Sequence, residues 1–164
     1  MEQKTNLHCE LFSRTHPYYL TIFTYAKQPH FKEQFNCELL LNVITYNKYS
    51  LDYKVFGFVI MPDHLHIIYY PGKVPIYEII LKNSANYTRY SQKVRGQAFQ
   101  VWADDYYLYE VKDYQTLGKN QKHIHSNPQR NCLVANLADY KYSSYGYYKD
   151  GKDEFTLLLD KVED

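Results

Sequence analysis

Two strand-like stretches joined by a short break constrain the fold of this chain most strongly. The first, YKVFGFVI, covers residues 53–60, and the second, HLHIIYY, covers residues 64–70. Both are rich in β-branched and aromatic residues, which favour strands. Only Met61, Pro62 and Asp63 separate them. So short a break between two strands predicts an antiparallel hairpin.

Two further segments have helical periodicity. Residues 31–48 repeat apolar side chains at a spacing of four, with Phe35 on the apolar face. Residues 75–94 do the same, and Val94 falls on the same side of the helical wheel as the earlier isoleucines. Each segment therefore predicts a helix with one buried face.

The strands and helices alternate in an informative order. Residues 18–25 (YYLTIFTY) predict a strand, and residues 101–112 (VWADDYYLYEVK) predict a turn that leads into another strand. Asp113 is a candidate N-cap of a last helix running to about Ser126, which Pro128 would close. The order is strand, helix, strand, strand, helix, strand, helix. It predicts an α+β fold with a ferredoxin-like (split βαβ) antiparallel sheet and helices packed on one face.

Composition narrows the class of protein. The 164 residues are 45% hydrophobic and 23% charged, which predicts a single domain over residues 1–164. A net charge of +1 means that any nucleic-acid partner must be held by a local basic patch. No apolar run suits a membrane span or signal peptide, so we expect a cytoplasmic protein. The three cysteines, Cys9, Cys37 and Cys132, form no CxxC motif and predict neither disulfides nor a thiolate zinc site.

His64 and His66 are the first candidate site residues. Side chains at positions i and i+2 of a strand project from the same face, about 7 Å apart along the strand. Both imidazoles could therefore reach one metal ion. The alternative is a pair of half-exposed histidines on a solvated strand face, which a bare His-x-His pattern favours.

The final helix offers a third ligand in the segment KHIHSNP, residues 122–128. His123 and Asn127 are four residues apart and share one helical face, whereas His125 is turned by about 200° from His123. Two imidazoles and an amide oxygen, with open positions, suit Mg²⁺ or Mn²⁺. The alternatives are a helix-capping role for Asn127 and a capping or packing contact for His125.

A polar, mostly basic stripe follows the second helix. Lys82, Arg89 and Lys93 lie on one side of the helical wheel, away from the apolar face. The stripe is a candidate phosphate track for DNA. Without other support, an ordinary solvated helix face is the better interpretation. The 20 tyrosines would suit stacking on unpaired bases as well as strand packing.

Five segments in order resemble the REP-associated tyrosine transposases, within the HUH group of single-strand DNA endonucleases that includes the single-tyrosine insertion-sequence transposases. The resemblance covers residues 17–148, with residues 149–164 as a C-terminal tail. Its segments are YLTIFTY, VIMPDHLHII, VWADDYY, HIHSNPQRNCLV and LADYKYSSYGYY. The second and fourth are the most specific.

The resemblance implies a metal-dependent enzyme of DNA transposition. His64, His66 and Asn127 match the family's ligands for a divalent ion, Mg²⁺ or Mn²⁺, that polarises a scissile phosphate. The implied partner is single-stranded DNA, expected to contain a hairpin. A helix tyrosine attacks the phosphate in the family and forms a covalent phosphotyrosine, followed by strand transfer. Family members act as monomers or homodimers, and the sequence does not choose between them.

The chain departs from the family at the nucleophile. The family reads Tyr-Ile-His-x-Asn-Pro, and this chain has His123 at the tyrosine position. His123 could attack phosphorus itself, or act as a general base or extra ligand, or mark the loss of cleavage with binding retained. Altered or lost cleavage ranks above a histidine nucleophile. Tyrosines such as Tyr106, Tyr107, Tyr109 and Tyr114 could substitute, and their spacing selects none of them.

We therefore expect a metal-dependent single-strand DNA endonuclease or transposase with His123 at the reaction centre. The alternative is a catalytically inactive or altered DNA-binding module of the same fold. The C-terminal stretch EFTLLLD, residues 154–160, is expected to form an edge strand or a short helix, and would be an association surface if exposed.

Overall fold

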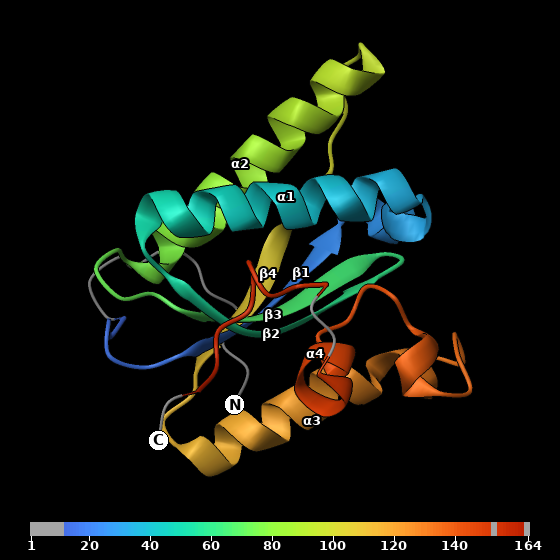
Figure 1. The fold of residues 1–164 in the computed structure, drawn as a ribbon. Helices are drawn as coiled ribbons and strands as arrows, with labels where there is room; N and C mark the ends of the chain where they lie inside the picture. Colours follow the sequence, from blue (N-terminus) through green and yellow to red (C-terminus); the bar gives the residue numbers. More distant parts are fainter. Residues whose placement is uncertain (1–11, 152–153, 163–164) are drawn as a thin grey trace.

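Four strands form one antiparallel sheet in the computed structural model, which describes residues 12–151 and 154–162 (Figure 1). The strands are β1 (Tyr18–Thr24), β2 (Lys54–Met61), β3 (His64–Tyr70) and β4 (Trp102–Glu110). Their order across the sheet is β2-β3-β1-β4, and every neighbouring pair is antiparallel. Pro62 and Asp63 form the tight turn between β2 and β3.

Helices α1 (Gln34–Leu51) and α2 (Ile76–Arg95) cover one face of the sheet (Figure 1). Helix α1 connects β1 to β2, and α2 connects β3 to β4. In each case the two connected strands are parallel to each other, and one other strand lies between them in the sheet. Such crossovers are almost always right-handed, which places both helices on the same side. The α+β class and the ferredoxin-like antiparallel sheet are therefore confirmed, and α1 and α2 share a face as expected.

Helix α3 (Tyr114–Arg130) lies on the opposite face, together with the short α4 (Tyr145–Asp150) (Figure 1). The expectation that the helices pack on one face is therefore corrected for α3. The reason is that the central strands carry apolar side chains on both faces, and both must be covered. The second, smaller core joins residues of the strands, of α3 and of the segment between β4 and α3: Tyr19, Phe56, Val59, Met61, Ile68, Val111, Leu117 and Ile124.

Three details of the helices differ from expectation. Phe35 is 49% exposed and Val94 is 61% exposed, although both were placed on buried faces. Phe35 belongs to the first turn of α1, and Val94 lies near the end of α2 that projects beyond the sheet (Figure 1). Pro128 lies inside α3 and the helix continues to Arg130. A proline in the last turn removes one backbone hydrogen bond without preventing the next two residues from completing the turn.

The C-terminal residues cover the free edge of β2. The backbone N–H of Ser144 donates to the carbonyl of Phe58, and the N–H of Asp160 donates to that of Val55. The segment EFTLLLD forms turns rather than a strand or a helix. Leu158 and Leu159 are buried in the main core, so these two side chains are covered within the chain rather than exposed for association.

An ion pair fixes this C-terminal segment on α1. Lys48 Nζ lies 2.8 Å from Asp160 Oδ2 and also donates to the carbonyl oxygen of Leu158 at 3.0 Å. The ammonium is largely buried, so the two acceptors offset the cost of removing its charge from water.

Cys37 is buried and Cys132 is exposed, and both are free thiols. Cys9 lies outside the described residues. Among the helices that the structure describes, none has the length and apolar character needed to cross a bilayer.

His125 joins α3 to the segment before α4. Its Nε2 lies 2.8 Å from Ser144 Oγ, and its ring packs against Tyr145 and Tyr148. Burial, with a smaller effect from Lys149, lowers the pKa of His125 to about 4. The packing contact considered as the alternative for His125 is therefore the one observed, and the ring is neutral at pH 7.

This pKa predicts a loss of stability in acid. Between pH 6.5 and about 4 the unfolded chain binds a proton at His125 that the folded chain does not, so the stability falls as the pH falls through this window. His125→Asn keeps a hydrogen-bonding side chain but does not titrate. Urea unfolding at a series of pH values from 7.5 to 4.5 gives the free energy of unfolding at each pH. The slope of this free energy against pH should be shallower in the variant by up to about 1.4 kcal/mol per pH unit. Equal slopes would contradict the assignment.

Candidate metal centre

His66 lies at the junction of three elements. Its side chain is 8% exposed and points from β3 toward α3. Nδ1 is 2.8 Å from Thr21 Oγ1 and 3.1 Å from the Tyr19 hydroxyl, both on β1. Nε2 accepts a hydrogen bond from Asn127 Nδ2 on α3 at 2.9 Å. Since Nε2 accepts, the ring proton of the neutral imidazole is on Nδ1, and the Nε2 lone pair faces α3.

Burial is the main cause of the low proton affinity of His66. Together with the positive charges that His64, His123 and Arg130 can carry, it lowers the pKa of His66 to about 3. The ring is therefore neutral throughout the physiological range. A neutral imidazole is the form that binds metal ions.

His64 is fixed by the turn rather than by the core. Its Nδ1 donates to Asp63 Oδ1 at 2.6 Å, which leaves the Nε2 lone pair available. The His64 and His66 rings have centroids 4.7 Å apart and pack edge to face. The alternating pattern of β3 places both histidines on the α3 face of the sheet, while Leu65 and Ile67 enter the main core.

Asn127 is buried in the last turns of α3 and is itself held by a neighbour. Asn131 Nδ2 donates to Asn127 Oδ1 at 2.7 Å and to the Asn127 carbonyl oxygen at 2.9 Å. The amide nitrogen of Asn127 therefore faces His66 and its amide oxygen faces Asn131. The amide would have to turn over for its oxygen to join the imidazoles as a ligand.

These three side chains fit a divalent ion in their chemistry. They offer two imidazoles and one amide, and the amide lies within hydrogen-bonding distance of the His66 ring. In the described part of the chain, no group of three His, Cys, Asp or Glu side chains could hold an ion. The candidate ligand set is therefore two imidazoles and the amide of Asn127.

His123 lies beside this group, at the edge of α3. Its ring centroid is 6.0 Å from that of His66 and 6.3 Å from that of Tyr19. The side chain is exposed. Arg130 Nη2 lies 3.1 Å from His123 Nε2, and since a guanidinium only donates, this nitrogen accepts. Desolvation and Arg130 lower the pKa of His123. One turn of helix thus brings position 123 next to Asn127, as the spacing predicts.

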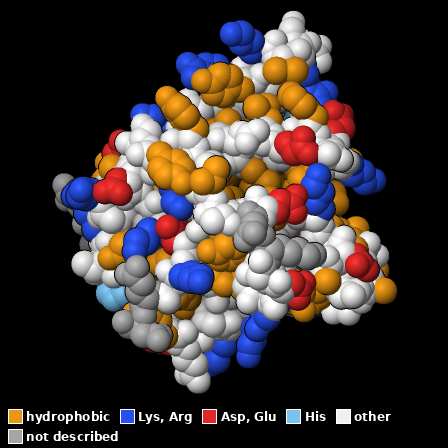
Figure 2. All heavy atoms as spheres, in the orientation of Figure 1, with side chains coloured by type: hydrophobic (Ala, Val, Ile, Leu, Met, Phe, Trp, Pro, Cys, Tyr) orange, Lys and Arg blue, Asp and Glu red, His pale blue; other side chains and the backbone are white. Residues whose placement is uncertain are grey.

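The basic side chains of α2 lie on the other face of the sheet. Lys82, Arg89 and Lys93 are exposed, but α2 packs on the side away from His66 and α3. The structure therefore does not bring them to the histidines. Figure 2 shows Lys and Arg side chains toward the projecting end of α2 and, separately, below the sheet where α3 lies.

A second basic face lies on α3 itself. Lys119, Lys122 and Arg130 are exposed and fall within about 80° of one another at 100° per residue. On the same wheel, His123 lies between this face and Asn127. The positive charges of α3 are thus adjacent to the candidate metal centre.

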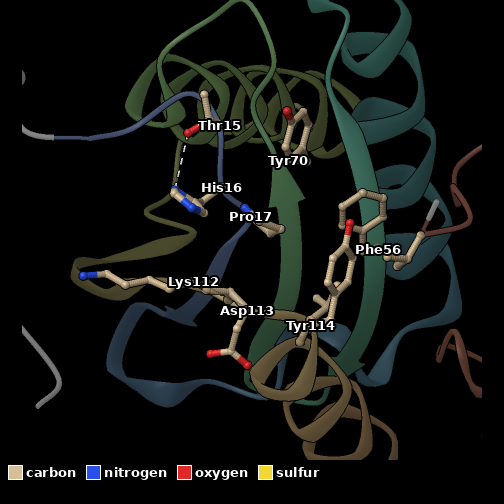
Figure 3. A pocket seen from close by; sticks show the side chains of 11 residues that line it. Thr15, His16, Pro17, Phe56, Tyr70, Lys112, Asp113 and Tyr114 are labelled. Atoms are coloured by element: carbon tan, nitrogen blue, oxygen red, sulfur yellow. Dashed lines mark hydrogen bonds between the residues drawn. The ribbon is translucent and has the colours of Figure 1, made fainter. Parts of the chain in front are cut away.

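A hollow of about 340 Å³ opens at the other end of α3 (Figure 3). Phe56, Tyr70 and Tyr114 line it together with Lys112 and other residues, and the Lys112 side chain extends along one side. None of the candidate metal ligands lines it. Since it lies at the start of α3, it is about 20 Å along the helix from Asn127 at 1.5 Å per residue.

The sequence alone did not reveal the hydrogen-bond partners of the candidate ligands. Asp63, Thr21, Tyr19 and Asn131 orient the two imidazoles and the amide. Asp63 directly precedes His64, so an acidic neighbour was a visible signal. The sequence also shows that Tyr19 and Thr21 alternate along a strand and so share a face. Only the register of β1 against β3, which pairs Thr21 with His66, shows that this face is directed to the His66 ring.

Neither a scan of protein-family models nor a search of curated proteins found a match to this sequence. Solved structures do match its fold. One is a REP-associated tyrosine transposase bound to a REP hairpin, with a TM-score of 0.74, 13% identity, and coverage of 98% of this chain and 94% of the other. Another, described as a transposase of Deinococcus radiodurans R1, has a TM-score of 0.52, 12% identity, and coverage of 73% and 95%.

The first of these likenesses extends over nearly the whole of both chains. At 13% identity it concerns the fold, and it agrees with the resemblance carried by the sequence motifs. The chain has the fold of a REP-associated tyrosine transposase.

Proposed function

We propose that this protein is a metal-dependent single-strand DNA endonuclease of the transposase type, acting on hairpin-containing DNA. The observation that carries the proposal is the meeting of His66 and Asn127 at 2.9 Å, beside His64 and position 123. These residues come from distant parts of the sequence and include a buried, neutral imidazole. The fold of known transposases supports the same conclusion.

Each residue has a role in this proposal. His64 presents its Nε2 lone pair from β3. His66 Nε2 accepts from Asn127 Nδ2, and it would become available to a metal ion when that amide turns over and offers its oxygen from α3. A divalent ion, Mg²⁺ or Mn²⁺, bound there would stabilise negative charge on a phosphate as it is attacked. Asp63 and Thr21 fix the tautomers that expose these lone pairs.

The DNA would follow α3. Lys119, Lys122 and Arg130 can neutralise phosphates next to the candidate site, and phosphate contacts supply most of the non-specific affinity. The matched transposase structure contains a REP hairpin, which supports a hairpin-bearing strand as the partner. Lys82, Arg89 and Lys93 on α2 would then contact only DNA that extends around the sheet edge.

A second candidate function is DNA binding without cleavage. It is favoured by His123 at the position of the family's nucleophile, with its Nε2 already accepting from Arg130. The two functions share the same DNA-binding surface. They differ only in whether a strand is cut.

Cleavage can be tested without knowing the target. The substrate is an internally labelled DNA pool with a fixed hairpin and randomised single-stranded arms, incubated with Mn²⁺. We expect cut strands from the unaltered protein. His64→Ala and His66→Gln should each slow cleavage by roughly 100-fold or more, because direct ligands matter at least as much as their supporting partners. Sequencing of the cut strands would give the preferred target.

The matched control is His16→Ala, which removes a histidine at the opposite end of the sheet and should cut normally. Circular dichroism and DNA affinity check that the site variants fold. Cleavage that persists in both site variants would exclude the proposed metal centre. Tight binding by the unaltered protein with no cut strands in Mn²⁺ would favour the binding module.

The DNA path predicts a particular salt dependence. Replacing Lys119 and Lys122 with alanine should lower the slope of log affinity against log salt by about 1.4 for a short single strand, at about 0.7 per lost phosphate contact. The pair Arg89→Ala and Lys93→Ala should leave that slope unchanged for a short strand. On a longer, hairpin-bearing strand the second pair should lower it by about one per lost contact. Fluorescence anisotropy from 50 to 300 mM salt measures both, and an unchanged slope for the α3 pair would remove α3 from the path.

A further inference from the structure

We infer that Tyr107 supplies the nucleophilic hydroxyl of this site, in place of the tyrosine that the helix lacks at position 123. The inference rests on the proposed function, since it names the attacking group of the same reaction. It follows from the strand register, from the ring contacts around Tyr107 and from the contacts that occupy the other nearby tyrosines.

The register of the sheet places Tyr107 in line with the candidate ligands. Thr21 on β1 pairs directly with His66 on one side and with Tyr107 of β4 on the other. Cross-strand partners project from the same face, so all three side chains rise toward the α3 side. The backbones of adjacent strands are about 4.8 Å apart. The Cα atoms of Tyr107 and His66 are therefore separated by about 10 Å, with Thr21 midway between them. A phosphodiester lying over Thr21 would be within reach of both.

Aromatic contacts hold Tyr107 on this side of the sheet. Its ring packs edge to face on Phe23, with centroids 6.2 Å apart, and Phe23 packs against His64 at 5.2 Å. The side chain is half-buried, so its position is defined while a strand of DNA can still reach it. Among the described residues, no hydrogen-bond partner holds the Tyr107 hydroxyl.

The other nearby tyrosines are unsuitable. Tyr106 packs with the main core on the opposite face of the sheet. The Tyr109 hydroxyl donates to Asn120 Oδ1 at 2.9 Å, and its ring stacks on Tyr19. Tyr19 is 4% exposed, and its hydroxyl lies 3.1 Å from His66 Nδ1. Tyr114 lines the hollow at the far end of α3 (Figure 3).

His123 is also a poorer nucleophile than its position suggests. Its Nε2 lone pair accepts from Arg130, so an attack through Nε2 would first break that contact. The same contact holds a guanidinium beside the site, where it can bind a phosphate. His123 and Arg130 are then suited to hold the DNA that Tyr107 attacks.

The chemical step is a transesterification. A bond forms between the Tyr107 oxygen and phosphorus, and the bond between phosphorus and the leaving sugar oxygen breaks. The phenolic proton passes to water and the leaving oxygen takes one from water, so charge and protons balance. The product is a phosphotyrosine on β4 and a free sugar hydroxyl.

The test uses the full chain with Mn²⁺ and the labelled hairpin pool, read on a denaturing gel for protein-linked label. Proteolysis and mass spectrometry of the linked species identify the modified residue. We expect the DNA to be attached at Tyr107. Tyr107→Phe should lower the yield of the linked species by at least 100-fold. Mn²⁺ binding, measured by calorimetry, and DNA affinity should be unchanged. Tyr109→Phe is the matched control and should keep it.

A rescue separates this inference from the proposed function. His123→Tyr, introduced into the Tyr107→Phe protein, should restore a linked species, now at position 123. Attachment at any other residue of the unaltered protein would overturn the role of Tyr107. So would a linked species that appears only after His123→Tyr. If the unaltered protein and the doubly substituted protein both bind Mn²⁺ and DNA but give neither linked nor cut strands, the proposed function is overturned and the inference with it.

Discussion

The buried ring of His66 connects the sheet to α3, and the arrangement of the whole site depends on it. One nitrogen is held by hydroxyls of β1 and the other by an amide of α3. An unpaired polar atom in this position would cost about 1–3 kcal/mol, so both contacts are needed once the ring is buried. The buried ring of His66 therefore requires both the pairing of Thr21 with His66 and the position of Asn127 over β3, because each one satisfies a different ring nitrogen. A shift of β1 by one residue would turn Thr21 and Tyr19 to the opposite face.

The two histidines differ because their surroundings differ. His66 is enclosed by two elements of the core, and burial lowers its pKa to about 3. His64 is held by Asp63 in the turn and keeps more contact with solvent. One imidazole is thus fixed by folding and the other by a local contact. Burial favours the neutral form of the His66 ring, whereas the carboxylate of Asp63 orients the His64 ring through Nδ1.

The sequence was sufficient for the four strands, for the three long helices and for the relative placement of some candidate site residues. Period-two alternation placed His64 and His66 on one face, and helical spacing placed position 123 beside Asn127, because both rules depend only on local geometry. The layer occupied by α3 was not predictable in this way. An amphipathic helix shows that it buries a face but not which side of the sheet receives it. The same limit applies to Lys82, Arg89 and Lys93, whose common stripe lies on the far side of the sheet from the histidines.

The candidate site divides into a buried half and an exposed half. His66 and Asn127 belong to the hydrogen-bonded interior, so replacing either one leaves a buried polar group without its partner. Position 123 lies on the helix surface, where substitutions change stability little. In the proposed site, the residue at position 123 can therefore be exchanged without a large loss of stability, whereas His66 and Asn127 are held in place by the folded interior. This division agrees with a histidine at position 123 in a chain that keeps His64, His66 and Asn127. In the proposed reaction, a tyrosine on β4 would reach the same phosphate through the existing strand register alone.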